Sequence, residues 1–412
     1  MIFDEQPRGR ESAAWRWVGF WVATIYLTIP LARIIQETVR DRAGKEAFLW
    51  ITFLAFAAAA AWIIRAFRRK QGNARPVQIA VLAGMGGLFS WLAWSLRANP
   101  EESFHFVQYG MLSVLLFRAL RHRLSDPSIY LTATLIGSAL GILDELIQWV
   151  VPRRYFDFRD IWINAQAVGL VQIALAAGIR PPGIRGRPTW TGLQLFCRAA
   201  MAVLLLLLLC VSATPRAVAF LARYLPAAAG LDHVPSEYGH RIEDPRIGVF
   251  FSRLPPAELH RQDRERGAAT ARALNRVRSD DQYRAFLRET PAHLNPLAVE
   301  ARIHLFRRDR YAGHALWATN REAAAAFARV AFRENQILQH FFSNTLEPSV
   351  FAWPEERVRR IQELATEPGP YESAVSRNLI TWTPQSRITA LLLALLLLAA
   401  AGDRLAATRS RP

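Results

Sequence analysis

The chain has 412 residues, of which 52% are apolar, and it carries a formal net charge of +17. Such an excess of positive charge first suggests a protein that binds nucleic acid. The layout excludes this class, because the apolar residues form runs long enough to cross a bilayer and the basic residues lie mostly at the ends of those runs. The sequence therefore predicts an integral membrane protein that contacts the membrane lipid bilayer and has no nucleic-acid partner.

Eight apolar runs have the length and composition of membrane-spanning helices, which need about 20 mostly apolar residues. The sequence thus predicts an all-α polytopic membrane protein with about eight transmembrane helices. The predicted spans are Trp15–Ile35, Ala47–Ile64, Val77–Leu96, Phe104–Leu120, Ser128–Val151, Asp160–Ile179, Leu193–Ser212 and Ile388–Gly402.

The basic residues predict the orientation of these spans. With the N-terminus inside, 17 Lys and Arg flank the spans on the inner side, against 7 in the short outer loops. Because short inner loops carry the excess of Lys and Arg, both termini are expected in the cytoplasm. The segment 214–386 is then expected outside the cytoplasm.

That segment differs in composition from the rest of the chain, being rich in Arg, Glu, Asp, His and Pro. Asn320 is expected to cap a helix through Ala323–Phe341, Pro354 to begin another, and Val299–Phe306 alternates weakly like a strand. We predict a mostly α-helical soluble domain inserted before the last helix. The expected divisions are transmembrane helices 1–2 (1–76), a transmembrane core (77–180), transmembrane helix 7 (181–213), the soluble domain (214–386), and the last helix with its tail (387–412).

Three groups of polar residues occur within or beside the predicted spans, where ionisable side chains are costly and usually functional. In the first group, Glu101, His105 and Tyr109 (or Gln108) share one face at helical spacing. A carboxylate one turn from a histidine can orient its ring for general base catalysis. The acids equally suit the first turn of a helix, where they interact favourably with the helix dipole.

The second group, Asp144, Glu145 and Gln148, lies near the outer end of the fifth predicted span. Gly141 and Gly137 precede it by about one and two turns, and glycines at that spacing allow another helix to approach closely. Glu145 and Gln148 are expected to form one polar edge, either as part of a site or as interior structural hydrogen bonding.

The third group follows Pro152. Asp157, Asp160 and Asn164 are spaced to share a face of the sixth span, and Arg154 carries a guanidinium suited to carboxylate or phosphate. A charged outer loop with a capping aspartate explains the same residues. Since all three groups fall at one membrane level, the sequence favours a single polar site that opens outward.

Taken together, these motifs resemble the VanZ-like family of bacterial membrane proteins over approximately Val77–Ile179. The family pattern is an acidic-Lys-x-x-His-Phe segment, a Glu-x-x-Gln turn, an Arg, and an Asp-x-x-Asp-x-x-x-Asn helix start. Here Glu101 replaces the usual aspartate, Glu102 stands where the family tends to have lysine, and Ala167 replaces an expected glycine, with Gly169 two residues further on. The resemblance implies a multi-pass protein of the bacterial cytoplasmic (inner) membrane and an association with resistance to the glycopeptide teicoplanin.

Three functions remain open at this point. The first is an envelope protein that binds or modifies a lipid-linked or cell-wall precursor. The second is a non-catalytic scaffold or sensor that recruits an envelope protein through residues 214–386. The third is a proton-coupled transporter. Whether the protein is an enzyme, and which cofactor or metal it uses, stays unknown. Under the first hypothesis the catalytic candidates are His105, Glu101, Glu145, Asp157 and Asp160, and the substrate-binding candidates are Arg154, Gln148, Tyr109 and Asn164.

Overall fold

The computed structural model describes residues 11–69, 75–152, 154–225, 231, 234–365 and 369–410. These residues are mostly helical, and they divide into two compact units. Unit 1 comprises Met1–Ser212, His233–Pro235 and Thr389–Pro412, and unit 2 comprises Ala213–Asp232 and Ser236–Ile388.

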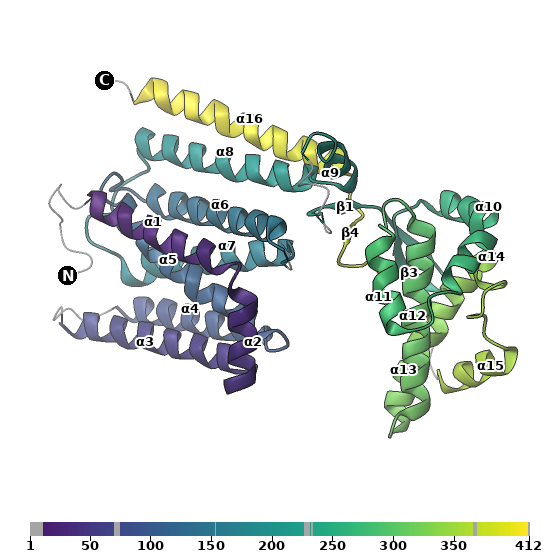
Figure 1. Cartoon of the computed structure of the whole chain (residues 1–412). Coiled ribbons are helices and arrows are strands. Elements are labelled where there is room, and N and C mark those ends of the chain that lie inside the picture. The colour runs from purple at the N-terminus through teal and green to yellow at the C-terminus, as the bar shows by residue number, and fades with distance from the viewer. Residues whose placement is uncertain are drawn as a thin grey trace. The chain divides into compact units, whose positions relative to one another are not determined.

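Unit 1 is built from long apolar helices (Figure 1). A 3₁₀ turn, η2 (Pro100–Ser103), precedes α5, and a π-helical turn, η3 (Ala174–Ile179), continues α7. The helices are α1 (Glu11–Thr28), α2 (Ala32–Ala43), α3 (Ala47–Arg69), α4 (Pro76–Ser95), α5 (Phe104–Leu120), α6 (Ser128–Val150), α7 (Phe158–Ile173), α8 (Trp190–Ser212) and most of α16 (Gln385–Arg409).

Seven of the eight apolar runs that the sequence marks as spans form one helix each over nearly their whole length, and the first run is divided between two helices. Among the described residues, six helices are long and apolar enough to cross a membrane, and α1 with α2 would add a seventh if the bent pair is one span. α5 has only 17 residues, which is short for a span. The structure therefore has six or seven candidate spans where the sequence predicts about eight.

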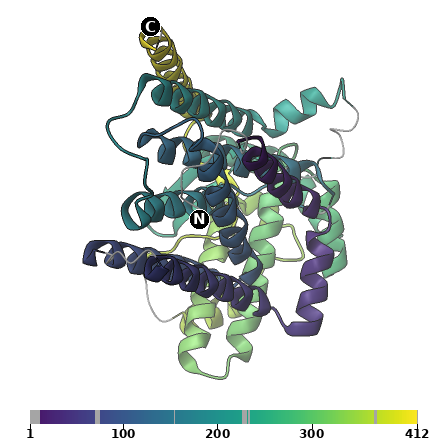
Figure 2. The same ribbon diagram turned by 90° about the vertical axis from the view of Figure 1, so that its left-hand side faces the viewer.

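The first predicted span is interrupted. α1 ends at Thr28, α2 begins at Ala32, and their axes are bent by 73° (Figure 2). Pro30 lies in the break, and proline both lacks a backbone N–H and restricts the residue before it to non-helical conformations. The run from Trp15 to Ile35 is consequently two helices and not one continuous helix.

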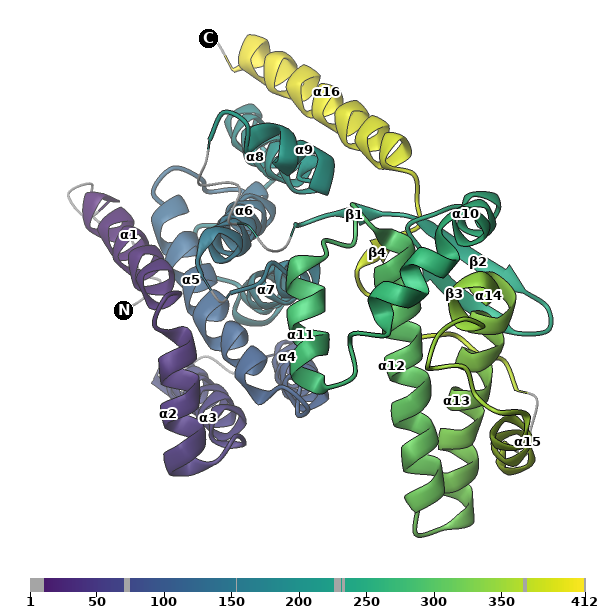
Figure 3. The ribbon, with the colours of Figure 1, turned by 45° about the vertical axis from the view of Figure 1, so that its right-hand side comes forward.

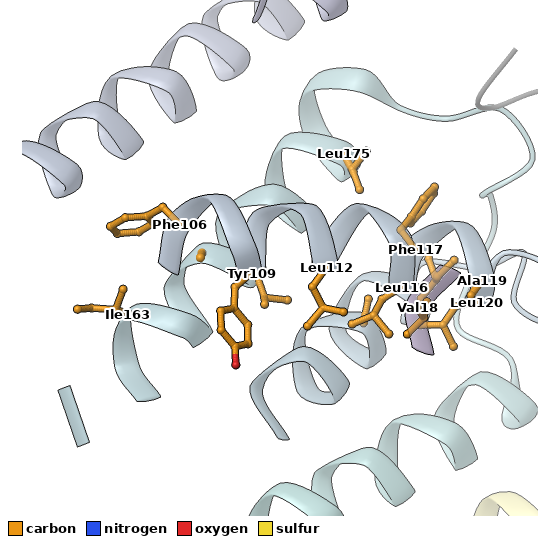
Figure 4. Packing of buried hydrophobic residues seen from close by; sticks show 14 of the residues in the cluster. Val18, Phe106, Tyr109, Leu112, Leu116, Phe117, Ala119, Leu120, Ile163 and Leu175 are labelled. Atoms are coloured by element: carbon orange, nitrogen blue, oxygen red, sulfur yellow. The ribbon is translucent and has the colours of Figure 1, made fainter. Parts of the chain in front are cut away.

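The short helix α5 lies at the centre of the main apolar core of unit 1 (Figure 4). It contacts α1, α6 and α7, and its inward side chains are almost fully buried. By contrast α3 and α4 expose large apolar side chains, as is expected of helices that face lipid. The buried residues of α5 include Phe106, Tyr109, Leu112, Leu116 and Phe117, and the exposed residues of α3 and α4 include Trp50, Leu54, Trp91 and Trp94.

Two glycines of α6 allow α7 to approach closely. A methyl group added at Gly137 would lie 2.7 Å from Val168 Cγ1, and one added at Gly141 would lie 2.9 Å from Asn164 Cβ. Both distances are shorter than a van der Waals contact. The prediction that these glycines admit a neighbouring helix is confirmed, and α7 is that helix.

Unit 2 is mostly helical with two small sheets. β2 pairs antiparallel with β3, and β1 pairs parallel with β4. Its elements are α9 (Pro215–Leu221), β1 (Glu237–Tyr238), β2 (His240–Asp244), β3 (Gly248–Ser252), α10 (Pro256–Leu274), α11 (Asp280–Glu289), α12 (Pro296–Trp317), α13 (Arg321–Phe341), α14 (Ser343–Leu346), α15 (Glu355–Leu364) and β4 (Ile380–Thr381).

The two longest helices of unit 2, α12 and α13, pack side by side (Figure 3). Asn320 caps α13 as predicted, its Oδ1 accepting a hydrogen bond of 2.7 Å from the Ala323 N–H. α15 begins directly after Pro354, also as predicted.

The strand predicted at Val299–Phe306 is wrong, because this segment lies within α12. All six residues from Leu297 to Arg302 are buried. A helical turn that is buried on every side shows no amphipathic period, so its residues can mimic the alternation of a strand.

Two buried carboxylates tie α12 and α13 to the rest of unit 2. Glu334 accepts hydrogen bonds from Tyr371 Oη at 2.5 Å and Ser373 Oγ at 2.7 Å, and its Oε2 lies 2.5 Å from His304 Nδ1. Burial acts to raise the pKa of Glu334, but His304, Tyr371 and Ser373 outweigh it and hold that pKa below its ordinary value.

Glu300 on α12 binds the end of β3. It accepts hydrogen bonds from Ser252 Oγ at 2.6 Å and from the Arg253 N–H at 2.8 Å. Here burial prevails over the attraction of Arg253 and raises the pKa of Glu300.

Candidate functional site

The polar groups singled out in the sequence meet where α5 begins, α6 ends and α7 begins. Consecutive helices joined by short connections run in opposite directions, so these three termini lie at the same end of the bundle. Four of the side chains are at most 2% exposed, which is unusual for polar residues and indicates a specific role. They are Asp144, Glu145, Gln148 and Asn164.

Asp144 and Tyr109 join α6 to α5. Tyr109 Oη donates a hydrogen bond of 2.9 Å to Asp144 Oδ2, and the Tyr109 ring stacks on the His105 ring with centroids 6.3 Å apart. Asp144, Asn164 and Arg154 lie around the His105 side chain. The structure thus places a carboxylate near His105, but it comes from α6.

Glu101, the predicted carboxylate partner, lies elsewhere. The α-helix begins at Phe104, so Glu101 belongs to the preceding 3₁₀ turn and is not one α-helical turn away from His105. Within the described residues, no hydrogen bond or ion pair is found for the Glu101 side chain. The geometry therefore gives Glu101 no direct contact with the cluster.

A second chain of contacts fixes the connection between α6 and α7. Gln148 Nε2 donates to Glu145 Oε1 at 2.5 Å, and Arg154 donates to Gln148 Oε1 through Nε at 3.1 Å and also through Nη2. The Asp157 N–H donates to Glu145 Oε2 at 2.9 Å. Both oxygens of Glu145 are engaged, which indicates that Glu145 positions this connection.

Asp157 and Asp160 differ in their surroundings. Asp157 is exposed and caps α7, its Oδ1 accepting a hydrogen bond of 2.8 Å from the Arg159 N–H. This is the capping role that the sequence offered as the alternative to a site role. Asp160 is half-buried, and Asp157, Arg159 and Arg154 are its charged neighbours.

Glu102, where the family pattern has lysine, is paired across the cluster. It lies 2.8 Å from Arg159 Nη2 and accepts a hydrogen bond of 2.8 Å from Asn99 Nδ2. Burial raises the pKa of Glu102 although Asn99 and Arg159 oppose the rise. A lysine at this position would face Arg159, so the exchange to glutamate fits the arginine that this chain carries.

Several buried polar atoms of the cluster have no hydrogen-bond partner within the described protein. They are Asp144 Oδ1, both terminal atoms of Asn164, and His105 Nδ1, and the Asn164 and His105 side chains lie within hydrogen-bonding reach of each other. A buried polar atom left unpaired costs about 1–3 kcal/mol, so native proteins rarely retain several together without a purpose. These atoms come from three different helices.

The unpaired atoms are also close in space. The Gly141 backbone lies against both Asn164 and Tyr109, since a methyl group there would be 3.3 Å from Asn164 Nδ2 and 3.4 Å from Tyr109 Cε1. Asp144 follows Gly141 by three residues on the same helix, and it bonds the same tyrosine. Among the described residues, no group of three or more His, Cys, Asp or Glu could hold a metal ion.

Sequence reasoning missed the importance of Asp144, which it grouped with Glu145 but did not place in the site. The feature of the sequence that could have identified Asp144 is its position one turn after Gly141, on the face of α6 that approaches α5. Tyr26 of α1 was missed entirely; its hydroxyl donates to the Leu140 carbonyl at 2.8 Å, one turn before Asp144.

Comparison with known proteins bears on the same part of the chain. The family model described as VanZ/LLP1 matches residues 46–176. This segment of the chain is VanZ-like. The VanZ-like segment runs from the start of α3 into η3 and contains the whole cluster. It extends the resemblance seen in the sequence toward the N-terminus by one helix. No curated protein and no solved structure matches the chain.

The VanZ-like segment and the apolar helices together establish a multi-pass membrane protein.

Proposed function

We propose that the VanZ-like segment binds the polar head of a lipid-linked cell-wall molecule at the outer face of the bacterial cytoplasmic membrane, and that this binding underlies a role in resistance to teicoplanin-type glycopeptides. The observation that carries the proposal is the set of unpaired buried atoms on Asp144, Asn164 and His105. A network that served only to hold helices together would satisfy its own polar atoms.

The charge distribution supports an outward opening. The cluster lies at the end of α5, α6 and α7 opposite to the arginines that flank the other end of the same helices. Those are Arg118, Arg121, Arg123, Arg180, Arg185 and Arg187. Because inner loops hold the excess of basic residues, the acidic end is expected to face outward.

The side chains suggest separate tasks. Asn164 offers a donor and an acceptor to a hydroxyl or amide group, and Asp144 offers an acceptor. Arg154 uses Nε and Nη2 on Gln148, which leaves Nη1 to bind an anionic group. His105 is partly exposed with Nδ1 unpaired, and a histidine near a carboxylate can transfer protons in acid–base chemistry.

A second candidate function is a non-catalytic scaffold or sensor. The observation that favours it is the continuous series of hydrogen bonds from the Asp157 N–H through Glu145 and Gln148 to Arg154. Such a series is typical of polar groups that stabilise a fold. Substitutions in that chain and in the unpaired set separate the two candidates.

The test compares His105→Ala, Asp144→Asn and Asn164→Leu with Glu145→Gln, and uses Asp41→Asn, an exposed acid of α2, as the control. Protein level in the membrane and teicoplanin susceptibility are measured for each variant. We expect normal levels with increased susceptibility for the first three variants, and a reduced level for Glu145→Gln. If the first three variants reach normal levels and the resistance of the wild type, the site does not have the proposed role.

A further inference from the structure

Unit 2 contains a pocket of about 570 Å³, independent of the VanZ-like site, which falls within the usual range for small-molecule sites of about 300–1,000 Å³. One face of α12 forms its floor over about three turns, with residues spaced three and four apart. Tyr283 of α11, Phe327 of α13 and the segment 374–379 close its sides. The residues that α12 contributes are Ile303, Phe306, Arg307, Arg310, Tyr311 and His314.

The walls of the pocket are aromatic and already ordered by stacking. The Tyr283 and Phe306 rings are parallel with centroids 4.5 Å apart, and the Tyr311 and Phe327 rings meet edge to face at 5.9 Å. Phe306 and Tyr311 are five residues apart, so they lie at opposite edges of the α12 face that lines the pocket. Aromatic side chains therefore border the pocket on both sides, and such surfaces suit sugar rings, whose apolar faces stack on aromatic side chains.

The charge of the pocket is positive. Its described lining includes no Asp or Glu. Arg307 is balanced by Glu334, whose Oε1 lies 3.1 Å from its Nε, and its guanidinium stacks over Tyr311 at 4.6 Å.

Arg310 is the pocket arginine for which the described residues provide no carboxylate partner. It is exposed, its guanidinium lies 6.0 Å from the Phe306 ring, and no ion pair is found for it among the described residues. The neighbouring Asp309 is taken by Arg308 at 2.9 Å and by Trp353 Nε1 at 2.8 Å. Arg310 is therefore available to bind a carboxylate on a molecule held against Phe306.

From these features we infer that the pocket of unit 2 binds an acidic glycan, with sugar rings stacked on Phe306 and Tyr311 and a sugar carboxylate bound by Arg310. A neutral glycan would keep the stacking and lose the charge-assisted contact.

Two disaccharides that differ in one carboxylate test this inference on the full-length protein in detergent. They are N-acetylglucosaminyl-N-acetylmuramic acid, which carries a lactyl carboxylate, and N,N′-diacetylchitobiose, which does not. Binding is measured by calorimetry for the wild type, Arg310→Gln and Phe306→Leu. The matched control is Arg357→Gln, which removes an exposed arginine that stacks over Trp353 at 4.7 Å on a different helix, outside the pocket lining.

We expect the acidic disaccharide to bind the wild type more tightly than chitobiose. Arg310→Gln should weaken the acidic ligand about tenfold without affecting chitobiose, as befits one charge-assisted contact. Phe306→Leu should weaken both ligands, and Arg357→Gln neither. Thermal unfolding of each variant verifies that unit 2 is folded.

Three results would overturn the inference. One is equal affinity of the wild type for the two disaccharides, and another is an equal effect of Arg310→Gln and Arg357→Gln. The third is tighter binding of vesicles of phosphatidylglycerol than of the acidic disaccharide, with loss of that binding in Arg310→Gln, which would assign the pocket to a lipid head group.

Discussion

Replacing Gly141 by alanine tests the closest helix contact in the candidate site. The new methyl group would lie 2.9 Å from Asn164 Cβ, whereas carbon atoms in contact prefer about 3.5–4.0 Å, a shortfall of about 0.6–1.1 Å. Asn164 is fully buried and its Cβ is fixed to the backbone of α7, so relief requires α6 and α7 to separate. Overpacking of this kind costs about 1–3 kcal/mol.

Gly87→Ala on α4 is the matched control, because a methyl group there meets nothing within 4 Å. Both substitutions gain the same helix propensity, about 1 kcal/mol, so the difference between the two variants isolates the overpacking. We predict that Gly141→Ala is less stable than Gly87→Ala by about 1–3 kcal/mol when the purified proteins are unfolded in mixed detergent micelles. Equal stability of the two variants would refute the packing of α6 against α7 described above.

The remaining predictions concern ion pairs, buried carboxylates and a helix cap. Glu102→Lys places two cations together and should lower the free energy of unfolding by up to about 1 kcal/mol, and adding Arg159→Glu should restore it; no recovery in the double variant would contradict the pair. Glu334 has a lowered pKa, so it stabilises the fold above the ordinary glutamate pKa of about 4.3, and that contribution is lost as the pH falls through its folded value. Glu300 has a raised pKa, so its contribution is present below about 4.3 and is lost as the pH rises toward its folded value. The difference in unfolding temperature between the wild type and Glu334→Gln should therefore increase with pH, and the difference between the wild type and Glu300→Gln should decrease. If the two differences changed with pH in the same direction, that result would be inconsistent with the structure. Asn320→Ala should cost about 1 kcal/mol through loss of the cap of α13, measured by chemical unfolding, and an unchanged value would argue against that cap.

The sequence was informative wherever one local signal decides a feature. The bounds of α5 agree with the predicted run Phe104–Leu120, because an apolar run with polar ends needs no partner to be recognised. The start of α13 follows from Asn320 alone, since a cap acts within one turn. Gly137 and Gly141 predicted a close helix contact for the same reason.

Features that depend on distant partners were not predictable. Asp144 bonds a tyrosine 35 positions earlier in the chain, and its neighbour Glu145 carries the same chemistry in the sequence while bonding the opposite side of the site. The face assigned to Glu101 and His105 assumed one continuous α-helix, whereas Pro100 begins a 3₁₀ turn in which that spacing does not apply. The hairpin of β2 and β3 escaped notice because β2 is largely charged.

The central claim, that the unpaired buried atoms of the VanZ-like segment bind a lipid-linked cell-wall molecule, is tested most directly by a binding measurement. The undecaprenyl-linked cell-wall precursor is added to the full-length wild type, Asp144→Asn and Asp41→Asn in detergent, and retained ligand is quantified by native mass spectrometry. We predict that the wild type and Asp41→Asn retain the precursor and that Asp144→Asn binds it at least about tenfold more weakly, as expected for the loss of a charge-assisted hydrogen bond. Equal retention by Asp144→Asn and the wild type, or no retention by the wild type, would contradict the claim.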